Sequence, residues 1–515
     1  MQPRPRTDLL PIIILVASLG SFSSPASAVT PWPGETWSGS TNLTSLNPTA
    51  WASNLSGAYW NPATRRLWVC TNGPAKFWSL RENGAGGFVI EREYAGTGDL
   101  EAICQIESVS DRVFVVDEQA RTIRSYRVSD GAALTTWFLS AIPDWGNLGP
   151  EGIAFVPNAW LAQIGFVDGA GAPYPQSVHG ANGFGGIVFI AVQTSGWVYA
   201  FDLRTDGTST FVGRYLSSRS ESCEMTFDDS IGRMYVLHNV DGNLLEITTL
   251  ASTASGADRR LVSSAEIQVP SGSNIEGFGL TPALGPGNVL GDRWCFFTDD
   301  SNLQGALRWF KQLPSKLEKY AGDGQSAPVL TSVATPPAVR VSDAFDNRLP
   351  GFAVTFQVTS GDGSITGGSA TTDGNGVGAV GSWTLGPVAG PNSLEASGTG
   401  LGGSPLTFTA TGDGPLAVEP HKADGVSLAP PSPHPGHGSL RISFTLANEM
   451  PITVAVFDAR GRRVRTLAAG TYARGAHRLV WDGRDEEGSV ASTGVYFYRL
   501  ALPERTLTRR GLLLH

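Results

Sequence analysis

The chain has 515 residues and a formal net charge of −9, with 63 Gly, 33 Pro and only 16% charged residues. A chain of this length exceeds what one hydrophobic core supports, so we expect several domains. The acidic charge excludes binding to a nucleic-acid backbone as the default function. Short runs of Val, Ile, Phe, Tyr and Trp alternate with Gly, Asn, Asp and Pro, which predicts an all-β fold with almost no helix.

The first 28 residues have the pattern of a secretory signal peptide. Arg4 and Arg6 precede an apolar stretch at residues 9–19, and residues 26–28 (Ala-Ser-Ala) form a cleavage site. Cleavage removes two Arg and one Asp, so the net charge moves from −9 to −10. No other segment has the ~20 apolar residues of a transmembrane helix. We expect a secreted or bacterial cell-surface protein with no transmembrane helix in the mature chain.

The chain contains four cysteines and no C-x-x-C spacing, which argues against a zinc or dithiol redox site. They are Cys70, Cys104, Cys223 and Cys295. In an oxidising compartment four cysteines permit three disulfide connectivities, and buried free thiols are the alternative.

A repeat of paired short strands runs through residues 36–320. Its copies begin NLSGAYW at Asn54, DLEAICQ at Asp99, GPEGIAFVP at Gly149, SCEMTFD at Ser222 and NIEGFGLTP at Asn274. Their spacing suits four-stranded propeller blades of roughly 40 to 50 residues. We count five blades, with six as the alternative, and a strand near residues 41–46 is available to close the last blade. The longest interval contains an insertion at residues 158–185.

These repeats resemble the SdiA-regulated family and the related esterase-like phytase group. The resemblance rests on the segments NLSGAYWNPATRRLWV, GPEGIAFVP, GRMYVLHNVDGNLLEI and NIEGFGLTP. Both groups are propellers, so it implies a β-propeller, which we place at residues 29–322. The esterase-like phytase group also implies hydrolase activity, although a shared fold does not transfer function.

Two further domains are expected after the propeller. Residues 326–412 alternate polar and apolar residues between turns, which predicts a β-sandwich. They resemble the invasin-type bacterial Ig-like domain in VSDAFD at residues 341–346 and VTF at residues 354–356. A Pro-rich linker is expected at residues 413–437.

The last segment, residues 438–515, resembles the FlgD-like Ig fold and the C-terminal sorting domains of type IX secretion. The resemblance rests on VFD at residues 456–458, WDG at 481–483 and GVY at 494–496, with a basic-then-apolar tail. It implies a second Ig-like sandwich with a role in export or surface attachment. A plain Ig-like spacer is the alternative, because the tail departs from the usual lysine-rich ending.

The repeat also predicts a ring of carboxylates. The first strand of each propeller blade lines the central channel, so equivalent positions converge on one axis. The equivalent positions are Ser56, Glu101, Glu151, Glu224 and Glu276. In the fourth repeat Glu221 competes with Glu224 for this position.

Partial burial of like charges raises their pKa values unless donors or a cation compensate. Two interpretations of the ring stay open. Backbone N–H groups of neighbouring blades satisfy the carboxylates, or the ring binds a hard cation such as calcium, with Glu101, Glu151, Glu224 and Glu276 as its ligands.

Polar residues also follow the second strands of the repeats. The pairs are Thr71-Asn72, Asp117-Glu118, Gln193-Thr194, His238-Asn239 and Asp299-Asp300. If they share a rim with the ring, they form a ligand pocket, for which we select Asp117, His238 and Asp299. Such residues are also common turn formers, and a buried structural histidine is the alternative for His238.

Two functions fit these patterns. The first is a secreted or surface protein that binds an extracellular ligand or partner through its propeller, with Ig-like domains for spacing and anchoring. The second is a calcium-dependent hydrolase of an ester, lactone or phosphate. The chain has no G-x-S-x-G, H-E-x-x-H or Walker motif, and His179 and His238 are the candidate bases of the propeller. We expect a monomer that does not bind nucleic acid.

Overall fold

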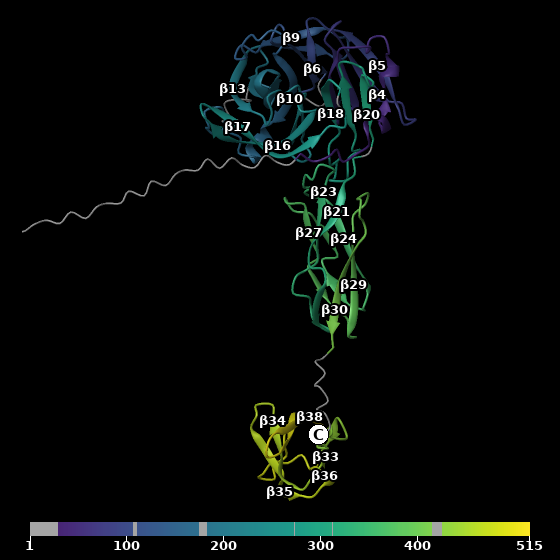
Figure 1. The fold of residues 1–515 in the computed structure, drawn as a ribbon. Helices are drawn as coiled ribbons and strands as arrows, with labels where there is room; N and C mark the ends of the chain where they lie inside the picture. Colours follow the sequence, from purple (N-terminus) through teal and green to yellow (C-terminus); the bar gives the residue numbers. More distant parts are fainter. Residues whose placement is uncertain are drawn as a thin grey trace, which may run out of the picture. The chain divides into compact units, whose positions relative to one another are not determined.

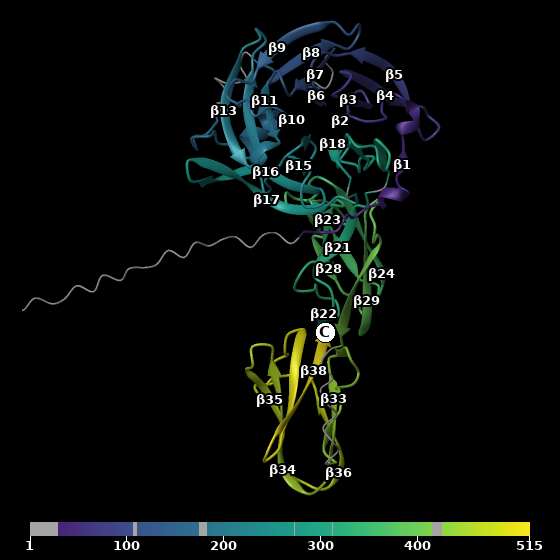
Figure 2. The same cartoon turned by 45° about the horizontal axis from the view of Figure 1, so that its top comes forward.

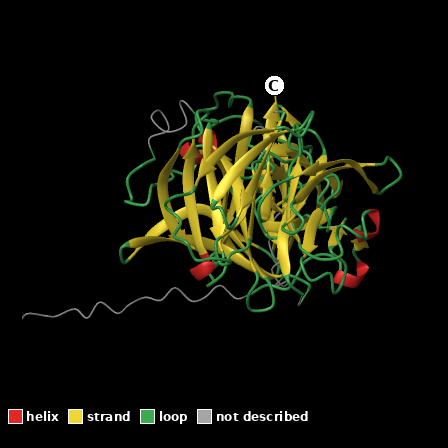
Figure 3. Ribbon diagram, turned by 90° about the horizontal axis from the view of Figure 1, so that it is seen from above, coloured by secondary structure: helices red, strands yellow, loops and turns green. Residues whose placement is uncertain are grey.

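The structure is a computed structural model that describes residues 29–106, 111–174, 183–271, 273–311, 313–414 and 425–514. The chain divides into two compact units, Met1–Gly412 and Asp413–His515. Strands are the main element of both units (Figure 3). Among the described residues, α1 (Asn158–Gln163) is the one α-helix, and the other helical segments are short 3₁₀ helices. The all-β prediction is therefore confirmed, and the predicted signal peptide lies outside the described residues.

The first unit begins with a propeller of five blades, each with four antiparallel strands. The third and fourth blades join into one eight-stranded sheet through a short parallel pairing of their outer strands. The first two blades are β2 (Leu55–Asn61), β3 (Arg66–Thr71), β4 (Lys76–Glu82) and β5 (Phe88–Ala95), then β6 (Leu100–Cys104), β7 (Arg112–Asp117), β8 (Thr122–Arg127) and β9 (Ala133–Phe138). The next two are β10 (Pro150–Pro157), β11 (Gly186–Val192), β12 (Trp197–Leu203) and β13 (Ser209–Leu216), then β14 (Glu224–Asp228), β15 (Arg233–His238), β16 (Leu244–Ser255) and β17 (Asp258–Gln268). The fifth combines β18 (Ile275–Leu280), β19 (Cys295–Asp299) and β20 (Leu307–Phe310) with β1 (Thr41–Asn42).

The ring of blades is closed at both its inner and outer strands. The inner strands β2, β6, β10, β14 and β18 each contact the next, and β18 contacts β2 (Figure 2). At the periphery, β1 pairs with β20 through Thr41 and Trp309, so the N-terminal segment completes the last blade. The 3₁₀ helices η1 (Trp37–Gly39) and η2 (Thr44–Leu46) flank β1. The propeller therefore has five blades, and the predicted closing strand is present.

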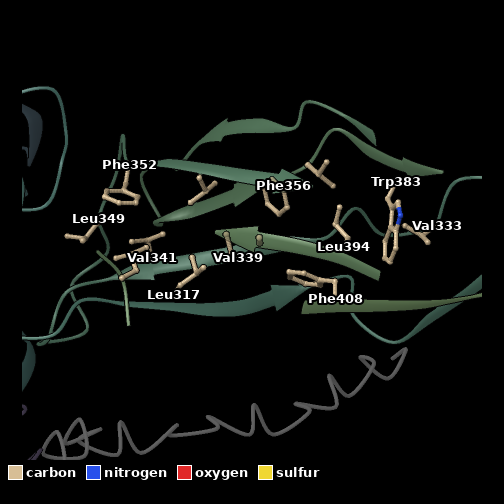
Figure 4. Packing of buried hydrophobic residues seen from close by; sticks show 14 of the residues in the cluster. Leu317, Val333, Val339, Val341, Leu349, Phe352, Phe356, Trp383, Leu394 and Phe408 are labelled. Carbon is tan, nitrogen blue, oxygen red and sulfur yellow. The ribbon is translucent and has the colours of Figure 1, made fainter. Parts of the chain in front are cut away.

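A β-sandwich follows the propeller within the first unit. One sheet contains β21 (Lys316–Ala321), β23 (Ala338–Ser342) and β27 (Val377–Ala379). The other sheet contains β22 (Gln325–Pro328), β30 (Leu406–Asp413), β29 (Gly390–Ser397), β24 (Ala353–Ser360) and β26 (Ser369–Thr371). A separate pair is formed by β25 (Ser364–Thr366) and β28 (Ser382–Thr384). Phe356, Trp383 and Phe408 fill the space between the strands (Figure 4). Our sequence boundary placed β21 in the propeller, but β21 pairs with β23, so the sandwich begins earlier.

A loop of the sandwich is buried against the propeller. Phe345 is 3% exposed and lies 5.6 Å from Tyr235 of β15 and 5.7 Å from Trp32, measured between ring centroids. The Asn347 amide donates to the Tyr235 hydroxyl at 2.9 Å. Because aromatic and polar contacts are both buried here, the loop joins the two domains firmly.

Replacement of Phe345 by Ala is expected to lower the free energy of unfolding of the first unit by about 3 to 5 kcal/mol, because it leaves a cavity in this joint. Thermal unfolding of the full chain measures the effect. The control is Val388→Ala, since Val388 is 70% exposed in the same sandwich and its truncation should change stability by less than about 0.5 kcal/mol. Equal unfolding temperatures for the two variants would show that the joint adds no stability.

The second unit is a smaller sandwich. Its sheets contain β31 (Ser427–Leu428), β33 (Leu440–Leu446) and β36 (Gly475–Trp481), and β32 (Gly436–His437), β38 (Thr506–Leu514), β37 (Gly494–Ala501), β34 (Met450–Asp458) and β35 (Arg463–Tyr472) (Figure 1). Trp481 and Tyr498 are fully buried in its core. The predicted linker at 413–437 is too long, because β31 and β32 pair with strands of this unit. Residues 415–424 lie outside the described residues.

All four cysteines are buried free thiols, so the structure contains none of the three disulfide connectivities. Burial raises the pKa of each thiol, which disfavours the reactive thiolate. In the described part of the chain, no helix is both long enough and apolar enough to cross a membrane.

Candidate functional site: an acidic channel mouth

Three of the predicted ring carboxylates occupy the same local structure. A β-bulge interrupts the pairing of the inner strand at Glu101 in β6, Glu151 in β10 and Glu276 in β18, one residue after each strand begins. The first blade has its irregularity at Ser56, as the repeat predicts. A bulge turns a side chain that would otherwise follow the strict alternation of the strand. We call this end of the channel, where the inner strands begin, the acidic mouth.

Glu224 does not share that position. In β14 it pairs directly with Leu237, one residue before the end of β15, and no bulge precedes it. Its Oε1 accepts hydrogen bonds from the backbone N–H groups of Met225 at 2.9 Å and Ile153 at 3.2 Å. The bulge position before Glu224 is occupied by Cys223. Glu224 Oε1 therefore fits the interpretation in which backbone amides satisfy the carboxylate, whereas Oε2 is buried and has no hydrogen-bond donor among the described residues.

A second group of side chains lies at the same mouth, on the residue that follows each second strand. These residues are Asn72, Glu118, Gln193, Asn239 and Asp300. Glu118 Oε1 accepts a hydrogen bond from Gly149 N at 2.8 Å, which ties the second blade to the third. Asn239 reaches Asn274 Oδ1 at 2.5 Å and so links the fourth blade to the fifth.

Asp99, Glu101 and Glu118 form the tightest cluster at the mouth. Each offers a carboxylate oxygen, and these three atoms lie within 4.8 Å of one another. Glu118 is 1% exposed, and its Oε2 has no hydrogen-bond donor among the described residues. The other two carboxyl groups have donors, since Gln119 Nε2 donates to Asp99 Oδ2 at 3.0 Å and hydrogen bonds from Ser56 and Asn72 lower the pKa of Glu101. A buried carboxylate oxygen without a donor in such a cluster is suited to a hard divalent cation.

The mouth raises the pKa values of its carboxyl groups. Burial, followed by the charges of Asp99 and Glu118, raises the pKa of Glu101 to about 8. Burial and Asp300 raise the pKa of Glu276 to about 9. Neither shift has a contribution from Lys or Arg among its main causes. No Lys or Arg among the described residues is thus a main charge partner of these two carboxyl groups.

Glu151 lies at the centre of this arrangement. Burial raises its pKa well above the ordinary value, and the charges of Glu101, Glu118 and Glu276 raise it further. The interaction between Glu151 and Glu118 adds to the raised pKa of Glu151 and opposes the rise in the pKa of Glu118. Such opposite effects are expected when two carboxyl groups lie close together without a compensating positive charge.

The three residues selected as ligand-binding have internal partners instead. Asp117 Oδ2 forms an ion pair with Arg124 at 2.9 Å. Asp299 Oδ1 accepts hydrogen bonds from the backbone and hydroxyl of Ser301 at 3.0 and 2.6 Å. Both residues end a second strand, so the alternation of side chains along the strand turns the following residue, Glu118 or Asp300, toward the mouth.

His238 is the buried structural histidine that the sequence analysis gave as its alternative. Nδ1 lies 2.5 Å from Glu221 O, a contact that needs a proton on Nδ1. Nε2 lies 3.1 Å from Glu246 Oε2, a contact that needs a proton on Nε2 or on Glu246. Ser222 is near Nδ1 at 3.3 Å, but that nitrogen is already engaged with the Glu221 carbonyl. The group is not arranged as a serine nucleophile with a free base. His179, the other candidate base, lies outside the described residues.

Three acidic residues of the mouth were not selected from the sequence, namely Asp99, Glu118 and Asp300. Glu221 was the alternative to Glu224, and its Oε1 accepts a hydrogen bond from Gln193 at 3.2 Å. Glu118 and Asp300 are the second members of two of the strand-end pairs predicted from the sequence. Selection of the residue that follows the strand in every pair would have identified both. Asp99 lies two residues before Glu101, as Asn274 does before Glu276 and Asn54 before Ser56, so the repeat itself contained that signal.

The comparisons with known proteins support this architecture. Residues 41–160 match the model of the SdiA-regulated family. Residues 433–502 match that of the FlgD Ig-like domain. The first match covers the first two blades and the inner strand of the third, and the second covers most of the C-terminal sandwich, in agreement with the resemblances predicted from the repeats and motifs. This combination is consistent with a surface protein.

Solved structures resemble the chain only distantly. A chain of the nidogen/laminin complex matches with 11% identity and a TM-score of 0.28, over 51% of this chain and 81% of its own length. PorZ, a surface component of the type-IX secretion system of Porphyromonas gingivalis, matches with 13% identity and a TM-score of 0.26, over 87% of this chain and 58% of its own length. The chain thus spans less than two thirds of PorZ. Among curated proteins there is no match.

Proposed function

We propose that this is a secreted or surface-displayed binding protein whose propeller holds a divalent cation, most simply calcium, at the acidic mouth and binds an extracellular ligand there. The observation that carries the proposal is the cluster of Asp99, Glu101 and Glu118, with a buried Glu118 oxygen that lacks a donor. Carboxylates with carbonyls and waters are the ligand set of calcium. A cation bound at a channel mouth keeps water-filled positions that oxygen atoms of a ligand can take.

The residues divide into two roles in this proposal. Asp99, Glu101 and Glu118 coordinate the cation directly. Glu151 and Glu276 balance its charge from the neighbouring blades, because both carboxyl groups interact electrostatically with Glu101. Glu224, whose Oε1 is held by backbone amides, stays outside the coordination sphere.

The test is calorimetric titration of calcium into the chelated full-length mature chain. The wild type should bind calcium with a dissociation constant of about 1 mM or tighter, the range of extracellular modules. Glu101→Gln with Glu118→Gln should weaken binding at least about 30-fold, because two of three ligands lose their charge. Glu224→Gln is the matched control and should bind as the wild type does. Absence of binding by the wild type, or equal loss in the control, would contradict the proposal.

A second candidate is a calcium-dependent hydrolase of an ester, lactone or phosphate. The observation that favours it is the buried Glu151 carboxyl beside the carboxylate cluster: burial and the charges of Glu101 and Glu118 raise its pKa, and a carboxyl group with a raised pKa suits a general acid. A bound cation would polarise the substrate oxygen. Turnover of ester, lactone or phosphate substrates that requires calcium and is lost in Glu151→Gln would select this candidate over simple binding.

A further inference from the structure

The propeller has a second cavity at the end of the channel opposite the acidic mouth. Its volume is about 120 Å³, and all five blades line it near the ends of their inner strands. The lining includes Tyr59, Ile106, Phe155, Phe227 and Pro282, one from each blade.

This cavity is separate from the acidic mouth. Between the two ends the inner strands touch through glycines: a Cβ on Gly152 would lie 2.6 Å from Glu224 Cα, and one on Gly57 would lie 2.8 Å from Ala102 Cα. Backbones this close leave no room for side chains. The two ends of the channel therefore present independent surfaces with different chemistry.

The wall of the cavity is aromatic. Tyr59, Phe155 and Phe227 are each only partly buried although they occupy inner strands, so their rings keep surface that protein atoms do not cover. Ile153 and Met225 add apolar surface to the same cavity. Aromatic rings that surround a small cavity attract cations as well as apolar groups.

One carboxylate at the rim is available for a ligand. Asp228 is fully engaged, because Oδ1 accepts from Ser230 N at 3.0 Å and Oδ2 accepts from Ala283 N at 2.8 Å. The side chain of Asp229 is exposed, and no other described residue donates a hydrogen bond to it or pairs with it. Tyr59 and Asp229 line the same cavity, and the charge of Asp229 adds to the raised pKa of Tyr59, of which burial is the main cause.

We propose that this cavity binds a single alkylammonium group, such as the side chain of a lysine on a partner protein. The aromatic wall takes the methylene stem and the face of the cation, and Asp229 pairs with the positive charge. One free carboxylate matches one positive charge, and the volume is suited to a side chain rather than to a folded segment. The acidic net charge of the chain favours approach of a cationic partner.

The experiment titrates the full mature chain with N-acetyl-lysine methylamide and with its neutral counterpart N-acetyl-norleucine methylamide, followed by saturation-transfer NMR. The lysine probe should bind at least about tenfold more tightly than the norleucine probe, since only the former gains the cation–aromatic and ion-pair contacts. Asp229→Asn should remove this preference, and Phe227→Ala should weaken binding of both probes.

Glu101→Gln is the control, because a cationic probe is also attracted to the acidic mouth. It should leave the lysine preference unchanged. Equal binding of the two probes, no binding of either, or a preference that is lost in Glu101→Gln and kept in Asp229→Asn would each overturn the proposal. Loss of calcium binding at the mouth has no bearing on this result, so the two sites are tested separately.

Discussion

Replacement of Gly277 by Ala is expected to lower the free energy of unfolding of the propeller by more than about 4 kcal/mol. Gly277 lies in β18, where the fifth blade meets the first. A Cβ at this position would overlap Ser56 O and Thr298 Oγ1 and would lie 2.9 Å from Ala58 N. Because two of these three atoms belong to the backbone of β2, the clash is relieved only by separating the strands that close the ring.

Gly279→Ala is the matched control for this substitution. It lies two residues further along the same strand and faces the same neighbour, yet its Cβ would be 3.4 Å from the nearest atom, Trp60 N. We expect it to change stability by less than about 1 kcal/mol. Chemical denaturation of both variants measures the difference, and similar unfolding midpoints would mean that the closure tolerates a side chain at position 277.

The cation-free protein is expected to lose stability as the pH rises from 5 to 9. Glu101 and Glu276 have pKa values raised to about 8 and about 9, so the folded state holds protons that the unfolded state releases near pH 4.5. The stabilising effect of a raised carboxyl pKa is complete below the unfolded value and is lost as the pH rises through the folded value. Because Glu276 keeps some contact with solvent, we expect a total loss on the order of 5 kcal/mol rather than the sum of two full shifts.

Thermal unfolding across this pH range, with chelator and with calcium, measures the effect. With chelator the unfolding temperature should fall by about 10 °C between pH 5 and pH 9. Calcium should reverse the fall, and its stabilising effect should increase with pH as the ligands ionise. The double variant Glu101→Gln, Glu276→Gln should show a flatter profile. A wild-type profile that is already flat with chelator would contradict the assignment of these protons.

The position of the carboxylates was predictable only in the blades whose inner strands share the same pairing register. Glu101, Glu151 and Glu276 each lie at a bulge one residue after the inner strand begins, so alignment of the repeats was sufficient to place them together. Glu224 was aligned with them because it is acidic and near the right spacing. The fourth blade lacks the bulge, and a shift of one residue in a strand moves a side chain to the opposite face.

A difference of one residue also separates the strand-end residues that were selected from the sequence from those that reach the acidic mouth. Asp117 and Glu118 are adjacent in sequence, but one pairs with Arg124 in its own blade and the other reaches the channel mouth. Composition does not distinguish them, since both are acidic residues beside a turn. Pairing register distinguishes them, and register depends on which strand lies opposite.

The sequence by itself determined the β class, the five repeats, the closing strand, and the two Ig-like segments, because periodicity, turn residues and motif spacing are local properties of the chain. The tertiary structure decided which carboxylates share the acidic mouth, that Glu224 is held by amides of another blade, and that an aromatic cavity with Asp229 lies at the opposite end. Those features depend on contacts between blades about 50 or more residues apart. They arise only when the inner strands converge on one axis, which no local pattern specifies.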